Sequence, residues 1–211
     1  MKSQNTIKTK QLIFITATNT DVGKSYACEQ FLKRYANMGY KVGYFKPIET
    51  GVITLPADGS KLLNLTKTLN PSFDVEINDV VPYQFKLPAA PFVAKKEHNI
   101  DIAFLKQKVA YLHTFCDVLI VEGAGGLMVP IEKEYFMIDL IKELKCKAIL
   151  IAPSHLGSIN DTLLSIEALK HRNIPFEWYI NLYKDKGSFN EVTLPFYEAY
   201  FNKVHYLGEW D

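Results

Sequence analysis

The sequence has few cysteines and no histidine motif, and each shortage excludes a class of protein. The three cysteines, Cys28, Cys116 and Cys146, form no CxxC pair, which argues against a disulfide framework and against a zinc site built from paired thiolates. The five histidines show neither HxxxH nor HExxH spacing, so they form no zinc-enzyme motif. We therefore expect a chain that works in a reducing cytoplasm.

The chain also lacks a segment suited to a membrane and an excess of either charge. No stretch approaches the roughly 20 apolar residues of a membrane-spanning helix, and the apolar run at 12–15 is too short for the core of a signal peptide. Lysine and arginine total 24 against 23 aspartates and glutamates, so no broad field attracts nucleic acid or an anionic membrane. We expect neither as a partner, and any anion site must be local.

What is present is an ordinary globular composition, 48% hydrophobic and 22% charged. A chain of 211 residues can bury a large share of its surface around one core. The sequence shows no internal repeat, low-complexity segment or linker. We therefore expect a single domain over residues 1–211.

Short apolar runs alternate with longer amphipathic stretches, which is typical of βαβ units and a mostly parallel sheet. We expect strands at 12–17, 41–45, 80–85, 117–121, 148–152 and 177–182. We expect helices at 24–38, 60–69, 101–114, 138–144 and 159–171, a polar turn at 184–188, and a helix with a short extended end in the last thirty residues. The predicted fold class is α/β, a mostly parallel twisted sheet flanked by helices in three layers, α/β/α.

The segment TATNTDVGKS, residues 16–25, has the pattern of a loop that binds phosphate groups. It follows an apolar strand and enters a helix at Gly23-Lys24-Ser25. In such a loop the backbone N–H groups face the phosphates, the lysine neutralises the β and γ oxygens, and the serine hydroxyl joins a Mg2+ shell. Thr18 stands where the strict pattern GxxxxGK[ST] has its first glycine. Taken alone, this segment has an alternative interpretation, in which GKS only begins a helix at a surface turn and binds no phosphate.

Two further polar side chains follow predicted strands and strengthen this interpretation. Glu122 comes after the apolar run VLIV and precedes three glycines in VEGAGG, and Lys46 follows a strand in YFKPIETG. In an open α/β sheet, ligands bind outside the carboxyl ends of the strands. Glu122 and Ser25 can therefore converge on one Mg2+ ion, with Lys46 at the same rim. A solvated acid at a glycine turn, and a solvated lysine, remain the alternatives for each residue taken alone.

Together, the segments TNTDVGKS, KPIETG and VEGAGGLMVPI resemble the motifs of the dethiobiotin synthetase family, whose usual forms are close to GTDTxVGKT, KPVxSG and VEGAGG. LGSIND, residues 156–161, is also similar to the LGxIN segment of that family. The resemblance runs from about residue 12 to about residue 182. It implies a fold like that of the P-loop NTPases.

The resemblance implies an ATP- and Mg2+-dependent ligase of biotin biosynthesis. In that reaction 7,8-diaminononanoate takes up CO2 as a carbamate, and the carbamate oxygen attacks the γ-phosphate of ATP to give a carbamic-phosphoric anhydride. The second amine then closes the ureido ring, and dethiobiotin, ADP and phosphate leave. A carbamate and a triphosphate are both anionic, so their in-line approach requires cations between them. Lys24, Lys46 and Mg2+ would supply these cations.

The resemblance also implies which residues form the site. Catalytic roles fall to Lys24 and Lys46. The nucleotide site comprises Thr20, Asp21, Val22, Gly23, Lys24, Ser25 and Asn181. The substrate site comprises Lys46, Thr50, Gly123, Ala124, Gly125, Gly126 and Asn160. The metal ligands are Ser25, Asp58 and Glu122, although an aspartate in PADGS also suits an ordinary turn.

Two asparagines leave alternatives open. Asn160 matches a family residue that reaches the substrate carboxylate in the neighbouring subunit, which implies a homodimer with its site at the subunit interface. Its residue type by itself favours the N-cap of the following helix. Asn181 is followed by Leu182, where the family often has an Asn-Asp pair that reads adenine. ATP is therefore the default nucleotide, and the choice of base stays open.

Other functions fit the sequence less well. A P-loop ATPase that positions or partitions other molecules usually has an extra lysine early in its loop, and residues 17–22 contain none. An amidotransferase of the cobyrinate type needs an added glutaminase domain, for which 211 residues are too few. A binding module without catalysis remains open. His155 follows a predicted strand, and a loop position suits it better than a role in the site.

Overall fold

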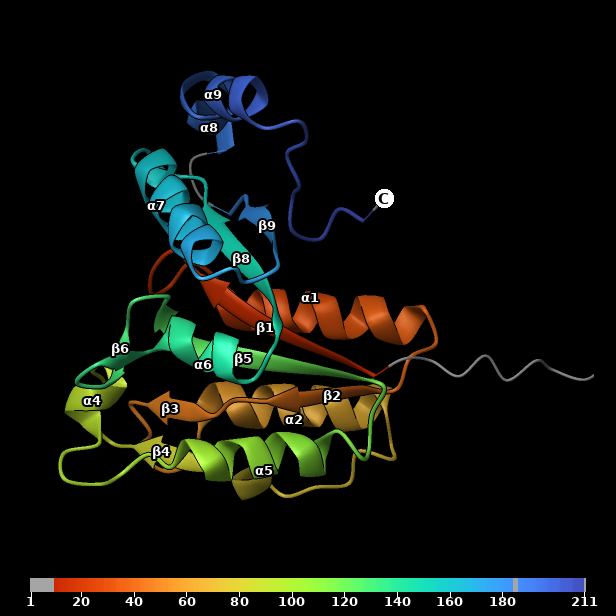
Figure 1. Cartoon of the computed structure of the whole chain (residues 1–211). Coiled ribbons are helices and arrows are strands. Elements are labelled where there is room, and N and C mark those ends of the chain that lie inside the picture. The colour runs from red at the N-terminus through yellow and green to blue at the C-terminus, as the bar shows by residue number, and fades with distance from the viewer. Residues whose placement is uncertain (1–9, 184–185, 211) are drawn as a thin grey trace, which may run out of the picture.

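The computed structural model describes residues 10–183 and 186–210, and a sheet of five parallel strands lies at its centre (Figure 1). The strand order is β2-β5-β1-β8-β9. The strands are β1 (Gln11–Ala17), β2 (Val42–Phe45), β5 (Val118–Gly126), β8 (Lys147–Pro153) and β9 (Phe176–Asn181). The five strands expected at 12–17, 41–45, 117–121, 148–152 and 177–182 all belong to this sheet.

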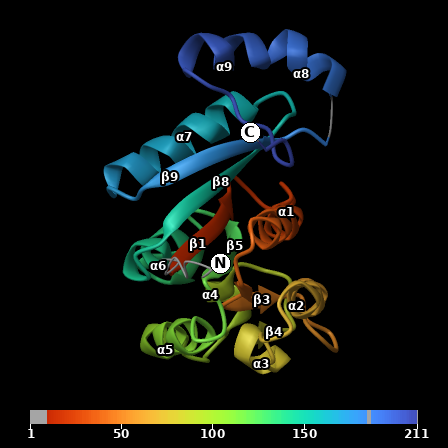
Figure 2. The same cartoon turned by 90° about the vertical axis from the view of Figure 1, so that its right-hand side faces the viewer.

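Helices cover both faces of the sheet, so the three-layer α/β prediction is confirmed. The helices α1 (Lys24–Asn37) and α2 (Ala57–Leu69) lie on one side, and α5 (Ile102–Leu112), α6 (Met137–Glu143) and α7 (Ser158–His171) lie on the other (Figure 2). None of the helices within 10–183 and 186–210 is long and apolar enough to cross a membrane.

The central strands are buried because helices pack on both of their faces. Val118, Leu119, Ile120 and Val121 of β5 are all fully buried, as are most side chains of β8. Continuous apolar runs of this kind are what a parallel sheet covered on two sides requires. Burial of these side chains contributes roughly 25 cal/mol for each Å² removed from water.

The segment between β2 and α5 differs from the expected helix and strand. The helix expected at 60–69 begins three residues earlier, as α2, so Asp58 lies in its first turn. The strand expected at 80–85 is shortened, because its first residue ends the short helix α3 (Ile77–Val80). The remainder, β4 (Tyr83–Phe85), pairs with β3 (Ile48–Thr50) in a separate two-stranded parallel sheet.

Several short elements were not expected. The helix α4 (Pro91–Ala94) begins at a proline, which has no N–H to lose at the first helical position. The strands β6 (Pro130–Glu132) and β7 (Tyr135–Phe136) form a small antiparallel pair after β5.

The last part of the chain contains two helices instead of one. These are α8 (Lys186–Val192) and α9 (Leu194–Tyr200), and Pro195 at the start of α9 separates them. Of the polar turn expected at 184–188, residues 184 and 185 lie outside the described residues, and 186–188 belong to α8. The extended end after α9 forms a bridge between Tyr206 and Ile180 of β9.

The topology opens a crevice beside β1. The helix that follows β1, α1, covers one face of the sheet, whereas α6, which follows β5, covers the other (Figure 2). Loops that leave neighbouring strands in opposite directions form a crevice at the carboxyl ends of those strands. The loop after β1, Lys46 after β2, and the second half of β5 with Glu122 all lie at this edge.

Candidate active site

Side chains at the end of β9 and just after it stabilise the loop between β1 and α1. The Nδ2 atom of Asn181 donates a hydrogen bond of 2.9 Å to the Val22 carbonyl, and the Tyr183 hydroxyl donates one of 2.8 Å to the Asp21 carbonyl. Gly23 has a φ of +99°, and a Cβ atom there would lie 2.2 Å from Asn181 Nδ2. Contacts within the protein therefore fix the backbone of this loop.

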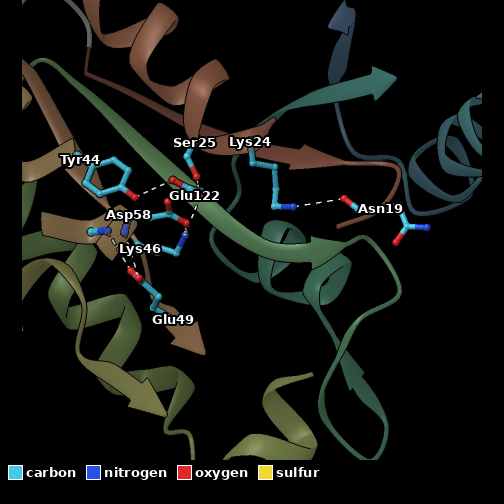
Figure 3. Close-up of polar contacts among 9 residues, drawn as sticks. Asn19, Lys24, Ser25, Tyr44, Lys46, Glu49, Asp58 and Glu122 are labelled. Carbon is cyan, nitrogen blue, oxygen red and sulfur yellow. Dashed lines mark hydrogen bonds and ion pairs between the residues drawn. The ribbon is translucent and has the colours of Figure 1, made fainter. Parts of the chain in front are cut away.

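Lys24, the first residue of α1, lies over the same loop. Its Nζ donates to the Asn19 carbonyl over 3.3 Å (Figure 3). Burial lowers the pKa of Lys24, while the nearby Glu122 carboxylate acts in the opposite direction. A phosphate oxygen would be a stronger partner for this ammonium than a neutral carbonyl. The position of Lys24 therefore suits the phosphate-binding role expected of it.

Glu122 is the centre of the polar cluster. This side chain is only 1% exposed. Its Oε1 accepts hydrogen bonds from Ser25 Oγ at 2.9 Å and from Lys46 Nζ at 2.7 Å, and its Oε2 accepts one from the Tyr44 hydroxyl at 2.7 Å (Figure 3). Glu122 lies within β5, which continues to Gly126 instead of ending at 121 as expected. Lys46 directly follows β2, and Ser25 lies in the first turn of α1. Residues far apart in the sequence therefore meet as the strand-end pattern predicted.

Lys46 joins the two acidic residues that the sequence suggested for a metal. Its Nζ is 2.7 Å from Glu122 Oε1 and 2.9 Å from Asp58 Oδ2. Burial alone would lower the pKa of Lys46, but Glu122 and Asp58 together raise it above its ordinary value. For the acid Asp58 the directions are reversed: burial alone would raise its pKa, but Lys46 lowers it below its ordinary value. The Lys46 ammonium thus favours the charged form of Asp58, and Asp58 and Glu122 favour the charged form of Lys46.

Glu49 is a residue of the site that the sequence reasoning did not single out. Its two carboxylate oxygens accept hydrogen bonds from the backbone N–H groups of Asp58, at 3.1 Å, and Gly59, at 3.0 Å. Glu49 thereby binds free N–H groups in the first turn of α2 and fixes the backbone that carries Asp58. Its place in KPIETG, three residues after Lys46, was the available signal.

A cleft of about 730 Å³ runs over this cluster. Most of the predicted site residues line it: Thr20, Asp21, Gly23, Lys24, Ser25, Lys46, Thr50, Asp58, Glu122, Gly123, Ala124 and Gly125. The opposite wall comes from 88–91, the segment Pro-Ala-Ala-Pro, which the sequence reasoning did not assign to the site. A second cleft, of about 740 Å³, meets the first at Pro88, and none of the predicted site residues lines it.

Four predicted residues do not line the cleft. Val22 and Asn181 bond to each other behind the phosphate loop. Gly126 packs against this loop, since a Cβ there would be 2.9 Å from the Thr18 carbonyl oxygen. Asn160 is exposed in the first turn of α7, and its Nδ2 donates to Asp161 Oδ1. The N-cap alternative for Asn160 is wrong, because Gly157 occupies that position.

The donors around Glu122 fit a magnesium ion. The Ser25 hydroxyl and the carboxylates of Glu122 and Asp58 supply oxygen atoms, the ligands that Mg2+ prefers. Within residues 10–183 and 186–210 there is no cluster of three or more His, Cys, Asp or Glu side chains suited to a metal. Mg2+ is commonly held by one or two carboxylates together with phosphate oxygens.

Comparisons with known proteins show which family the chain is similar to. The model of a family described as an AAA domain matches residues 11–180. The chain is 52% identical over 190 residues to the ATP-dependent dethiobiotin synthetase of Sulfurovum sp., with 90% of each chain covered. It is 40% identical to the ATP-dependent dethiobiotin synthetase of Wolinella succinogenes, with 88% of each covered.

Solved structures with the same fold are more distant in sequence. A plasmid partition protein from Borrelia burgdorferi has a TM-score of 0.58 at 15% identity, covering 95% of this chain and 89% of that one. The cell division protein MinD from Aquifex aeolicus has a TM-score of 0.54 at 17% identity, covering 93% and 80%. These two similarities show the shared fold and nothing more.

Proposed function

The chain belongs to the family of ATP-dependent dethiobiotin synthetases, and we propose that the cleft around Glu122 is where it carries out their reaction. It is an ATP-dependent ligase of biotin biosynthesis. The observation that supports this cleft as the site is the shared contact of Ser25 and Lys46 with Glu122 Oε1. It joins the phosphate loop to β5 and to the end of β2.

In the proposed site the triphosphate lies along the loop that precedes α1. Backbone N–H groups of Thr20 to Ser25 would bind its oxygens, and Lys24 would exchange its 3.3 Å contact with the Asn19 carbonyl for the β and γ phosphates. Asn181 would act indirectly, since its amide bonds to the loop carbonyl of Val22. This arrangement does not depend on a particular base, so ATP follows from the family and not from the cleft.

The diamine and its carbamate would occupy the other half of the cleft, between Lys46 and the backbone of Gly123 to Gly125. A lysine ammonium has three protons to donate. Two of those of Lys46 bond to Glu122 and Asp58, and the third would bind a carbamate oxygen. Because the pKa of Lys46 is raised, this residue would serve as a fixed cation and not as a general base.

The reaction then proceeds between two bound anions. One amine forms its bond to CO2 and loses a proton; a carbamate oxygen forms its bond to the γ-phosphorus while the bond to ADP breaks. The second amine attacks the carbamoyl carbon, phosphate leaves and another proton is released. Lys24 and Lys46 would hold the two reacting groups in line and lower the repulsion between them.

Ser25, Glu122 and Asp58 would hold the Mg2+ of this reaction. When bound, Mg2+ neutralises charge on the β and γ phosphate oxygens. Lys46 and Ser25 donate to the same oxygen of Glu122, so this carboxylate is turned toward the phosphate loop. We propose that Glu122 keeps this orientation in the loaded site.

A homodimer would complete the substrate site. Asn160 is exposed and does not line the cleft of its own chain, so a role in substrate binding requires the cleft of a second copy. Exposed apolar side chains lie close to it in sequence, Leu156 at 79% exposure and Leu164 at 63%.

The three cysteines are buried and free, which supports action in a reducing cytoplasm.

One assay tests the proposed function. The protein is incubated with 7,8-diaminononanoate, bicarbonate, Mg2+ and each of the common nucleoside triphosphates, and dethiobiotin and phosphate are measured. The proposal fails if no triphosphate yields dethiobiotin above a Lys24→Ala control. Glu122→Gln should raise the Mg2+ concentration needed for half-maximal rate far more than it lowers thermal stability. If Glu122→Gln instead lowers thermal stability as severely as it impairs the use of Mg2+, Glu122 is structural.

A further inference from the structure

The two oxygens of the Glu122 carboxylate have different partners. Oε1 accepts from Ser25 and Lys46, the residues that the proposed function assigns to metal and substrate. Oε2 accepts from the Tyr44 hydroxyl at 2.7 Å. A carboxylate can rotate about its terminal torsion, which has a broad energy minimum. The hydrogen bond from the Tyr44 hydroxyl to Oε2 restricts this rotation, while Ser25 and Lys46 bond to the other oxygen.

Strand register explains why Tyr44 reaches Glu122. In the parallel pair of β2 and β5, Tyr44 lies opposite Ile120. Alternate residues of a strand face the same side of a sheet, so Glu122, two residues after Ile120, lies on the face that Tyr44 occupies. Lys46, two residues after Tyr44, reaches the same carboxylate. The two-residue spacing of Tyr44 and Lys46 therefore brings donors to both oxygens of Glu122.

The Tyr44 hydroxyl donates to Glu122 from a position that is buried away from water. The side chain is fully buried, with 0% exposure. Burial, followed by the negative charge of Glu122, raises the pKa of Tyr44 well above its ordinary value. The hydrogen bond of 2.7 Å to Glu122 Oε2 uses the phenol as a donor, as a carboxylate partner requires. The buried Cys28 thiol lies near the same carboxylate, and burial and Glu122 also raise its pKa.

We propose that Tyr44 is a positioning residue of the metal site, because its hydroxyl holds Oε2 of Glu122 and so directs Oε1 toward Ser25. This inference rests on the proposed metal role of Glu122 and extends it to a residue behind the ligand. Partners of this kind, which bond to a ligand and not to the metal, commonly change metal affinity by about 10- to 100-fold when they are removed.

The test measures binding of Mn2+, used as a probe for Mg2+, to the full chain. Free Mn2+ is followed by electron paramagnetic resonance in the presence of saturating non-hydrolysable ATP analogue. Tyr44→Phe removes the hydroxyl and keeps the ring. We expect it to weaken Mn2+ binding by about 10- to 100-fold. We also expect the affinity for a fluorescent ATP analogue in EDTA, which does not involve the metal, to change less than about twofold, since Tyr44 does not contact the phosphate loop.

Tyr179→Phe is the matched control. Tyr179 is a second buried tyrosine, 6% exposed, whose hydroxyl also donates to a carboxylate, Glu177 Oε2 at 3.2 Å. It lies outside the cleft, so Mn2+ affinity should stay within about twofold of wild type even if stability falls.

Three results would overturn the inference, each for a different reason. If Glu122→Gln loses Mn2+ affinity but Tyr44→Phe keeps it within about twofold of wild type, Glu122 binds the metal without help from Tyr44. If Glu122→Gln also keeps its Mn2+ affinity, the proposed metal role of Glu122 fails, and the role of Tyr44 fails with it. A loss in Tyr44→Phe that Tyr179→Phe matches would assign the effect to general loosening of the fold.

Discussion

Replacing Gly23 with alanine tests whether Asn181 holds the phosphate loop. Gly23 has a φ of +99°, and an added Cβ would lie 2.2 Å from Asn181 Nδ2. Atoms cannot approach so closely, so Asn181 must move and give up its hydrogen bond to the Val22 carbonyl. Gly157 offers a control, because its φ is +92° and no described atom lies within 4 Å of an added Cβ. Gly157→Ala therefore reports backbone strain without a clash.

The structure gives different magnitudes for the two variants. The left-handed conformation costs a residue with a Cβ atom about 1–2 kcal/mol, and both variants carry this cost. Gly23→Ala also loses a buried hydrogen bond, which contributes about 0.5–1.5 kcal/mol. We therefore expect Gly23→Ala to lower the free energy of unfolding by about 2–3 kcal/mol. In an Asn181→Ala background only the strain should remain, because the clash and the bond are both absent.

Urea unfolding without nucleotide, followed by circular dichroism, measures all four proteins of this cycle, and Gly157→Ala is measured beside them. The affinity for a fluorescent ATP analogue should fall in Gly23→Ala and in Asn181→Ala, since either change frees the loop. If Gly23→Ala lowers the free energy of unfolding equally in the wild-type and Asn181→Ala backgrounds, the reasoning is refuted. Asn181 would then not stabilise the loop.

Three further predictions concern other parts of the structure. Glu49→Ala should lower the free energy of unfolding by about 1–2 kcal/mol in urea, because it frees two N–H groups in the first turn of α2. Lys108 lowers the pKa of Asp79, so the stability from this pair is present above the unfolded pKa, near 4, and is lost as the pH falls through the folded value. The difference in unfolding free energy between wild type and Asp79→Asn, about 0.2–1 kcal/mol at neutral pH, should therefore shrink in acid. Asn160→Ala should raise the KM for the diamine without changing the melting temperature, and an unchanged KM would contradict the substrate role of Asn160.

Much of the fold could be predicted because its signals are local. The apolar runs of β5 and β8 are continuous, as strands covered on both faces must be, and each is followed by polar or glycine residues. The phosphate loop and Lys46 were found for the same reason. Strand ends are visible in a sequence, and parallel strands bring their ends to one edge.

The remainder depends on contacts that the sequence does not reveal. The pair β3 and β4 joins residues 35 positions apart, such as Ile48 and Tyr83. The sequence indicated a strand near β4, but not β3 and not the pairing of the two. Tyr44 and Glu122 are 78 positions apart, so only the register of β2 on β5 shows that they meet. Glu49 was visible in its motif, but its role follows from the early start of α2.

The most direct test of the central claim follows one carbon atom through the reaction. The protein is given 13C-labelled bicarbonate, 7,8-diaminononanoate, Mg2+ and ATP, and the label is followed by NMR while released phosphate is measured. We expect the label in the ureido carbonyl of dethiobiotin, with one phosphate released for each labelled molecule, and no label in the product mixture of Lys24→Ala. Phosphate release without labelled dethiobiotin in the wild-type protein would contradict the account.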